Sequence, residues 1–187
     1  MKNWIGISLG DVTGVGPEVA LKAIAAEAAA DETKYLLIGD EHYVHQLNAT
    51  LGLNLPLKKF TGANDAGKFF ITNPRSELLP ENLPVGSPLA AHAAVSALHD
   101  GGHRCLRGEL DAIVTAPVNK ESIIRAGHKF IGQTEFLSEL AGTERTAMML
   151  LGTDEHGRWL RVALATVHIA IKSVPERLTA EKITLAI

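Results

Sequence analysis

The sequence has 187 residues, of which 46% are hydrophobic and 21% are charged, and its formal net charge is −3. These values are typical of a globular protein, and with the charges spread along the chain they give no indication of a nucleic-acid or membrane partner. Cys105 is the only cysteine, which excludes an internal disulfide framework and favours a reducing compartment.

Neither a signal peptide nor a membrane helix is expected. The apolar run at the N-terminus is short and is interrupted by Gly6 and Ser8, and no apolar stretch of about 18 residues follows. We therefore predict a cytoplasmic protein that has no membrane partner.

The first half of the chain predicts alternating strands and helices. Residues 4–9 are typical of a buried strand, and a glycine-rich loop at 10–16 leads into a helix that Pro17 opens and that is expected to run to about Ala30. A second strand at 35–40 and a helix at 41–51 repeat this order. Because alternation of this kind favours a parallel sheet covered by helices, we predict an α/β fold with three αβα layers.

The loop at 10–16 favours an anion by its geometry, because free N–H groups point outward where a strand leads through glycines into a helix. Its glycine spacing matches neither the dinucleotide nor the P-loop fingerprint. A tight turn that only needs glycine is an equally good interpretation.

The middle of the chain predicts short strands at 55–57 and 69–71, a proline-rich connection, and an alanine-rich helix. Ser87 is the expected N-cap of this helix, and Pro88 occupies its first position. We expect the helix to end near Arg107.

The stretch from Asp111 to Leu137 has the densest group of chemically able side chains. A buried central strand is predicted at 112–115, where Pro117 ends it. Ligands of open α/β sheets lie at the carboxyl ends of strands, so Asn119 and Lys120 are candidates to bind a phosphate or carboxylate. A capped helix with an exposed lysine explains these two residues equally well.

A second polar group, Gln133 and Thr134, precedes a helix predicted at 135–141. With Thr134 as N-cap, these residues stabilise a helix start without any ligand. Spacing alone therefore assigns them no function.

The last third predicts a β-hairpin with strands at 147–151 and 159–165 and a turn at 154–157, followed by His168 and a helix from Pro175. A lone histidine is more often hydrogen-bonded than metal-bound, and no histidine lies two or four residues from His168. A metal at His168 would need distant or inter-subunit ligands. The other histidines are expected to be solvated.

Five segments occur in an order that is similar to one known family. They are GDVTGVGPE, TAPVNKESI, GQTEFL, MMLLG and VALATVH. The sequence resembles the 4-hydroxythreonine-4-phosphate dehydrogenase family of vitamin B6 biosynthesis, which includes dehydrogenases of related four-carbon phosphorylated hydroxy acids. The resemblance covers essentially all 187 residues.

The resemblance implies a fold like that of isocitrate and isopropylmalate dehydrogenases, with two α/β domains and a homodimer. It implies that NAD or NADP accepts a hydride from 4-phosphooxy-threonine or a related phosphorylated hydroxy acid while a divalent metal such as Zn, Mg or Co polarises the alcohol oxygen. Decarboxylation follows, as part of pyridoxal phosphate biosynthesis.

Three site residues follow from the resemblance. His168 matches a metal-binding histidine, and Thr134 matches the threonine of a Gly-His-Thr-Glu motif whose His-Thr pair binds substrate. Gln133 stands where that motif has histidine, which removes a charge-assisted contact to the substrate. Asn119 and Lys120 remain second-tier substrate-binding candidates, and no residue is assigned to the cofactor or to a catalytic role.

The resemblance also implies that the chain is the N-terminal half to two-thirds of a longer dehydrogenase. We expect residues 1–187 to lack the cofactor-binding C-terminal portion, with a sub-boundary near 105–115. One histidine does not make a tight metal site, which takes three or more protein ligands, so we expect the isolated chain to be inactive. The alternative is a non-catalytic module that binds an anion or serves assembly.

Overall fold

The computed structural model describes residues 3–27, 32–62 and 64–187. The chain forms two compact units, residues 1–141 and 142–187, and each is described by itself. The range 105–115, where a sub-boundary was predicted, lies inside the first unit. The predicted end of the first helix near Ala30 lies outside the described residues.

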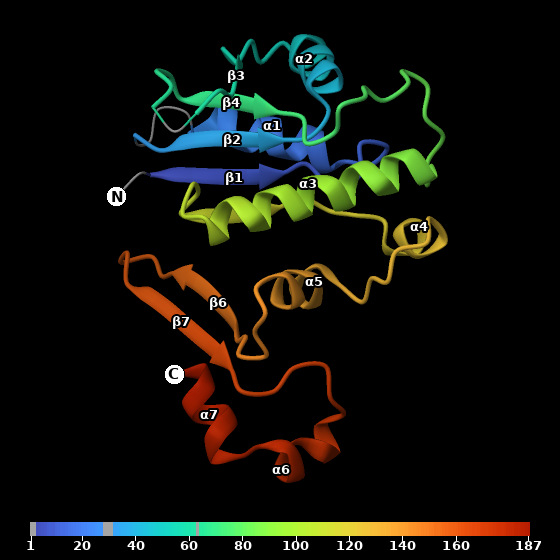
Figure 1. Ribbon diagram of the computed structural model, residues 1–187. Coiled ribbons are helices and arrows are strands. Elements are labelled where there is room, and N and C mark those ends of the chain that lie inside the picture. The colour runs from blue at the N-terminus through green and yellow to red at the C-terminus, as the bar shows by residue number, and fades with distance from the viewer. Residues whose placement is uncertain (1–2, 28–31, 63) are drawn as a thin grey trace. The chain divides into compact units, whose positions relative to one another are not determined.

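The first unit is built on a five-stranded sheet in which every pairing is parallel (Figure 1). The strand order is β3-β4-β2-β1-β5. The strands are β1 (Trp4–Ser8), β2 (Lys34–Ile38), β3 (Lys58–Lys59), β4 (Phe69–Thr72) and β5 (Ala112–Thr115). The predicted α/β class is confirmed, although the strand expected at 55–57 forms instead at β3.

Helices cover both faces of this sheet because successive side chains of a strand point to opposite faces. Ile7 and Leu37 pack with α1 (Gly16–Glu27) and α2 (Glu41–Thr50), whereas Trp4 and Leu36 pack on the face of α3 (Pro88–Leu106). The two short helices α4 (Lys120–Arg125) and α5 (Gln133–Leu140) pack against α3. The three layers predicted from sequence are thus present in the first unit.

The start of α3 agrees with the prediction. Ser87 is the N-cap and accepts a hydrogen bond from the backbone N–H of Leu89, and Pro88 occupies the first turn. The hydroxyl supplies an acceptor to one of the N–H groups that the first turn leaves unpaired.

The prediction of a buried central strand at 112–115 is wrong. Within the described residues β5 pairs with β1 alone and forms an edge of the sheet. Val114 is 51% exposed, and no residue of β5 is fully buried. An apolar run cannot distinguish a central strand from an edge strand, because both can face a helix on one side.

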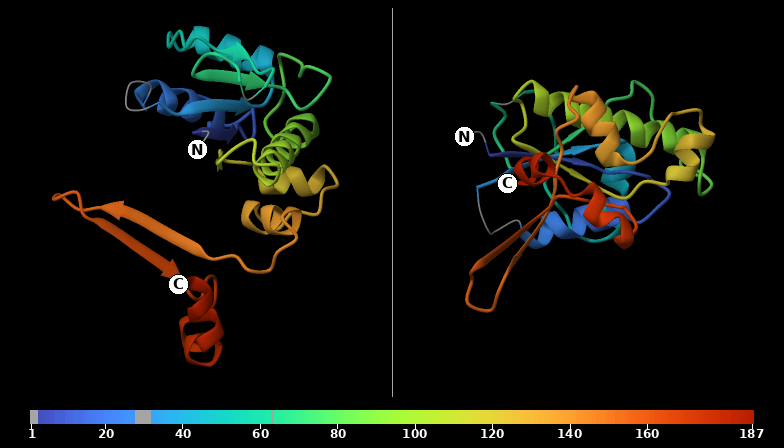
Figure 2. Two further views of the ribbon diagram at one scale, coloured as in Figure 1. Left: turned by 60° about the vertical axis from the view of Figure 1, so that its left-hand side comes forward. Right: turned by 90° about the horizontal axis from the view of Figure 1, so that it is seen from below.

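The second unit contains the predicted hairpin, with β6 (Met148–Thr153) and β7 (Trp159–Leu164) antiparallel (Figure 2). The expected turn is confirmed, since Asp154 accepts hydrogen bonds from the backbone N–H groups of His156 and Arg158. After a short 3-10 turn (Ile171–Ser173) come α6 (Val174–Arg177) and α7 (Ala180–Ala186).

The single helix expected from Pro175 is therefore wrong. Leu178 leaves the helical region with ψ 109, and Thr179 caps a new helix by accepting from the backbone N–H of Lys182. Threonine competes for backbone hydrogen bonds and so favours a helix start over a helix interior. None of the helices in the described ranges combines the length and apolarity needed to cross a bilayer.

Candidate functional site

The carboxyl ends of β1 and β5 are joined beyond the sheet. The Ala116 N–H donates to the Ser8 carbonyl at 2.9 Å, and the Asp11 N–H donates to the Pro117 carbonyl at 3.1 Å. The glycine-rich loop after β1 and the segment 116–119 after β5 are thereby held side by side. This is the edge at which open α/β sheets bind ligands.

Glycine is required at two positions of this junction. A Cβ at Gly10, whose φ is +69°, would lie 2.2 Å from the Pro117 carbonyl oxygen, and one at Gly16 would lie 2.7 Å from the Leu9 carbonyl oxygen. No side chain fits these backbone approaches. Packing against residue 117 therefore explains Gly10, and the close approach to Leu9 explains Gly16.

Asp11 shapes the same loop from inside. Its side chain is buried and accepts hydrogen bonds from the backbone N–H of Thr13 at 2.9 Å and from the Thr13 hydroxyl at 2.7 Å. Burial raises the pKa of nearby Tyr43, and the negative charges of Glu18 and Asp11 raise it further. Tyr43 thus stays a neutral hydrogen-bond donor over the physiological range.

Gln133 is brought to this junction from α5. Its side-chain Nε2 donates to the Ala116 carbonyl at 3.3 Å, whereas its Oε1 is buried and has no partner in the described part of the chain. An unpaired buried acceptor costs about 1–3 kcal/mol, which an incoming N–H or O–H donor would recover. Gln133 is therefore the position where the site has an unused hydrogen-bonding group.

The start of α5 differs from the prediction. Gly132 is the N-cap and makes no side-chain cap, so Gln133 begins the helix and Thr134 is its second residue. Thr134 is exposed. The predicted capping role of Thr134 is wrong, because the backbone turns into the helix two residues before it.

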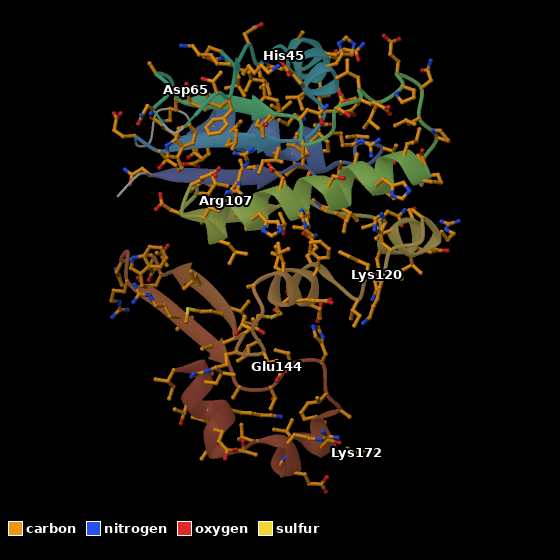
Figure 3. The ribbon with its side chains drawn as sticks, in the orientation of Figure 1. His45, Asp65, Arg107, Lys120, Glu144 and Lys172 are labelled. Atoms are coloured by element: carbon orange, nitrogen blue, oxygen red, sulfur yellow. The ribbon has the colours of Figure 1, made fainter. Side chains whose placement is uncertain are left out.

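Asn119 and Lys120 follow the same strand end but face different surroundings. Asn119 is the N-cap of α4, and its side-chain oxygen accepts from the Ser122 N–H at 3.0 Å. Lys120 is exposed at the start of that helix (Figure 3). Capping accounts for Asn119, while the ammonium group of Lys120 is accessible to an anion.

His168 lies in the second unit, just after β7, as predicted. It is exposed, and its φ of +55° is a left-handed conformation that is uncommon outside glycine. Among residues 3–27, 32–62 and 64–187 no group of three or more His, Cys, Asp or Glu side chains could hold a metal ion. The described part of the chain therefore offers a divalent metal a single histidine here.

Sequence reasoning missed a cavity at the carboxyl ends of β1 and β2. It has a volume of about 270 Å³, and its walls include Thr13, Gly14, His42 and Tyr43. Leu79 of the proline-rich connection also lines it, and the carboxylate of Asp40, the N-cap of α2, accepts the Leu79 N–H at 2.7 Å and so ties this connection to α2. The glycine-rich loop was the one signal in the sequence that could have indicated this cavity. The proline-rich connection that forms its other wall has no periodic pattern from which its position could be predicted.

The expectation that the other histidines are solvated is wrong for two of them. His92 Nδ1 and His128 Nε2 lie 2.7 Å apart in a direct hydrogen bond, and both rings are half-buried. Burial lowers the pKa of His128, and the neighbouring His92 lowers it further. The two residues are 36 positions apart, so no local pattern could have paired them.

Comparison with known proteins gives consistent relatives. The family model "Pyridoxal phosphate biosynthetic protein PdxA" matches residues 31–187. The 4-hydroxythreonine-4-phosphate dehydrogenase of Geobacter metallireducens is 35% identical over 184 residues, covering 96% of this chain and 53% of that protein. The D-threonate 4-phosphate dehydrogenase of Cupriavidus necator is 36% identical over 171 residues, which cover 89% of this chain and 50% of that protein.

A solved structure shows the same arrangement of elements. The crystal structure of a 4-hydroxythreonine-4-phosphate dehydrogenase from Burkholderia phymatum superimposes with a TM-score of 0.82 at 32% identity, over 96% of this chain and 54% of that chain. The chain thus spans about half the length of the relatives it matches. Because the family model covers most of its residues, the chain belongs to the PdxA family of pyridoxal phosphate biosynthetic proteins.

Proposed function

We propose that this chain is the substrate-binding part of a dehydrogenase in pyridoxal phosphate biosynthesis. The substrate is 4-phosphooxy-threonine or a related four-carbon phosphorylated hydroxy acid, and NAD or NADP is the oxidant. Relatives named for 4-hydroxythreonine-4-phosphate and for D-threonate 4-phosphate support this substrate class. In the reaction the secondary alcohol loses a hydride to the nicotinamide and a proton, and the β-keto acid formed then loses carbon dioxide.

The observation that best supports a substrate site here is the unpaired Oε1 of Gln133 beside segment 116–119. A hydroxyl or ammonium group of the substrate would donate to this oxygen after a small rotation of the side chain. Thr134 offers an exposed hydroxyl next to it, and Lys120 offers an accessible cation for the phosphate or carboxylate. Asn119 positions the start of α4 through its cap.

Gln133 changes what this site can recognise. A histidine at this position could become cationic, and a charge-assisted hydrogen bond is about twice as strong as a neutral one. Glutamine both donates and accepts but stays neutral. We therefore expect weaker binding of the doubly charged phosphate than in a relative with histidine.

The divalent metal of the proposed reaction, whether Zn, Mg or Co, is not matched by a complete ligand set. His168 would supply one ligand, while catalytic metal sites commonly take three from protein. The described residues contain no group of three candidate ligands, and we propose that a longer form of the chain or a second polypeptide supplies the others. The cofactor-binding portion is likewise assigned to residues outside this chain, with 1–187 as the N-terminal part of a two-domain enzyme.

A homodimer is the proposed assembly, and the β6–β7 hairpin is the surface that supports it. Within the second unit its apolar side chains are left uncovered: Leu150, Leu151, Trp159 and Leu160 are 58%, 62%, 64% and 65% exposed. A two-stranded hairpin is only marginally stable by itself and gains stability from further strands or packing. Its two apolar faces fit a second copy of the same hairpin.

Binding and turnover of the isolated 187-residue chain test the function. Titration with 4-phosphooxy-threonine is expected to give saturable binding, and Gln133→His is expected to tighten it several-fold because a cationic ring can pair with the phosphate. Thr134→Val, which removes one hydroxyl at constant shape, is expected to weaken binding. Unchanged substrate affinity in both variants would mean that neither Gln133 nor Thr134 contacts the substrate.

The second candidate, a non-catalytic module for an anion or for assembly, is favoured by the absence of a three-ligand metal group in the described residues. Reduction of NAD by the chain with added Mg²⁺ or Zn²⁺ and substrate discriminates between the two. We expect no reduction by the isolated chain, and reduction after a longer family member's C-terminal portion is supplied. Reduction by the isolated chain would exclude the non-catalytic module.

A further inference from the structure

Two histidines on α3 face each other at the surface of the first unit. His99 and His103 are four positions apart, and their Nε2 atoms lie 3.2 Å apart in a ring-to-ring hydrogen bond that a bound metal ion would replace. Their ring centroids are 4.4 Å apart and the rings are tilted by 70°. The i, i+4 spacing places both rings on one side of the helix, as in helical zinc motifs.

The separation of the two nitrogens suits a shared metal ion. Two imidazole nitrogens at 2.0–2.1 Å from a tetrahedral metal lie about 3.3 Å from each other. The pair His92 and His128, at 2.7 Å, is too close for this and is held by its direct hydrogen bond. Small rotations of the His99 and His103 rings would direct both lone pairs to one point.

The surroundings leave room for a hydrated ion. His99 and His103 line a cavity of about 600 Å³ together with Ser96 and His128. No third His, Cys, Asp or Glu forms a ligand group with them in the part of the chain that the structure describes. Water would therefore occupy the remaining positions, and the ion would be exchangeable.

The local charge also permits a cation. Arg104 pairs with Asp100 at 2.7 Å and with Glu109 at 2.9 Å, and Arg107 pairs with Glu109 at 2.7 Å, so the two guanidinium groups are balanced by two carboxylates. His103 lies in the last turn of α3, where the helix dipole is negative and favours positive charge.

We propose that His99 and His103 chelate one divalent transition-metal ion of the Ni²⁺, Cu²⁺ and Zn²⁺ class at the surface of α3. Imidazole ligands suit these metals, with Cu²⁺ bound most tightly. The site is made by residues of the first unit and does not depend on the dehydrogenase function.

Calorimetric titration of the 187-residue chain with Ni²⁺ alone tests the site. We expect one saturable site, and we expect His99→Gln and His103→Gln each to weaken it on the order of a hundredfold, because either change leaves one ligand and removes the advantage of the second. His45→Gln is the matched control, because His45 is an exposed histidine of another helix, α2, and this change is expected to leave Ni²⁺ affinity unchanged. Circular dichroism of each variant verifies that the helix is intact.

Two further variants locate the metal. His128→Gln and His156→Gln are expected to keep the affinity of the wild-type chain, since neither residue belongs to the pair. Loss of Ni²⁺ binding in either of them, with full binding in His99→Gln, would overturn the proposal. Absence of saturable Ni²⁺ binding by the wild-type chain would overturn it as well.

Discussion

At the scale of single residues, Gly10 gives the most direct test of how the loop after β1 is held. Gly10→Ala adds a Cβ 2.2 Å from the Pro117 carbonyl oxygen at a φ of +69°. We expect a loss of about 1–2 kcal/mol from the left-handed backbone and about 1–3 kcal/mol more from the clash. The difference in the free energy of unfolding between Gly10→Ala and the wild-type chain, measured in urea, gives the sum of these two losses.

Gly52 is the matched control for this change. Its φ is +65°, but nothing lies within 4 Å of a Cβ built there. Gly52→Ala should therefore show only the backbone cost of about 1–2 kcal/mol. Equal losses in the two variants would mean that the loop does not pack against Pro117 as described.

His128 predicts a pH dependence of stability. Burial and then His92 lower its pKa below the ordinary value of 6.5, so the unfolded chain binds more protons than the folded chain just below that pH. The contribution of neutral His128 to stability is fully present above pH 6.5, and it is lost as the pH falls toward the pKa of His128 in the folded chain. Urea midpoints between pH 7.5 and about 5 should fall less in His128→Gln than in the wild type, whereas a parallel fall would contradict this origin.

Sequence reasoning at this scale found residues whose surroundings are local and missed those whose partners are distant. Gln133 was identified as a site candidate, but its hydrogen bond to Ala116, 17 positions away, was not predictable. The His92–His128 contact was missed for the same reason. Side-chain roles that depend on long-range packing have no periodic signature in the sequence.

At the scale of elements, Asn119 separates a structural role from a binding role. Asn119→Ala removes the cap of α4 and should cost about 1 kcal/mol of stability, while Asn119→Ser keeps a capping oxygen and should cost little. Thermal unfolding of both variants measures this difference. Substrate binding lost in Asn119→Ser at unchanged stability would show that the amide contacts the ligand directly and does more than cap.

Most elements were predictable because their signals are local. Short, mainly apolar runs predicted β1 and β2, and Ser87 with Pro88 predicted the start of α3. The burial of β5 was not predictable, because whether a strand lies at an edge depends on which other strands join the sheet. The break between α6 and α7 at Leu178 and Thr179 was not predicted, because the apolar residues before and after it have the spacing of one continuous helix.

At the scale of the whole molecule, the hairpin predicts self-association. Leu151→Lys places a charge on a side chain that is 62% exposed within the second unit, and it should convert a dimer to monomer because a charge is costly to bury in an apolar interface. Leu78→Lys, at 59% exposure in the first unit, is the control and should leave the dimer intact. Sedimentation equilibrium gives both masses, and a monomeric wild-type chain would contradict the proposed assembly.

The family resemblance was readable from ordered motifs, and the match over residues 31–187 agrees with it. The division of the chain into two units was not readable from the sequence. The boundary lies between Ala141 and Gly142, in a loop whose composition resembles other loops of the chain. Compactness is a property of the folded contacts, which a linear pattern does not contain.

The most direct test of the central claim is a map of backbone amide shifts in the 187-residue chain titrated with 4-phosphooxy-threonine. Binding at the junction of β1, β5 and α5 predicts saturable shifts at residues 116, 118–120 and 132–134, and smaller ones across the cavity beside Tyr43. Saturable shifts confined to that cavity, or no shifts at all, would contradict a substrate site at Gln133.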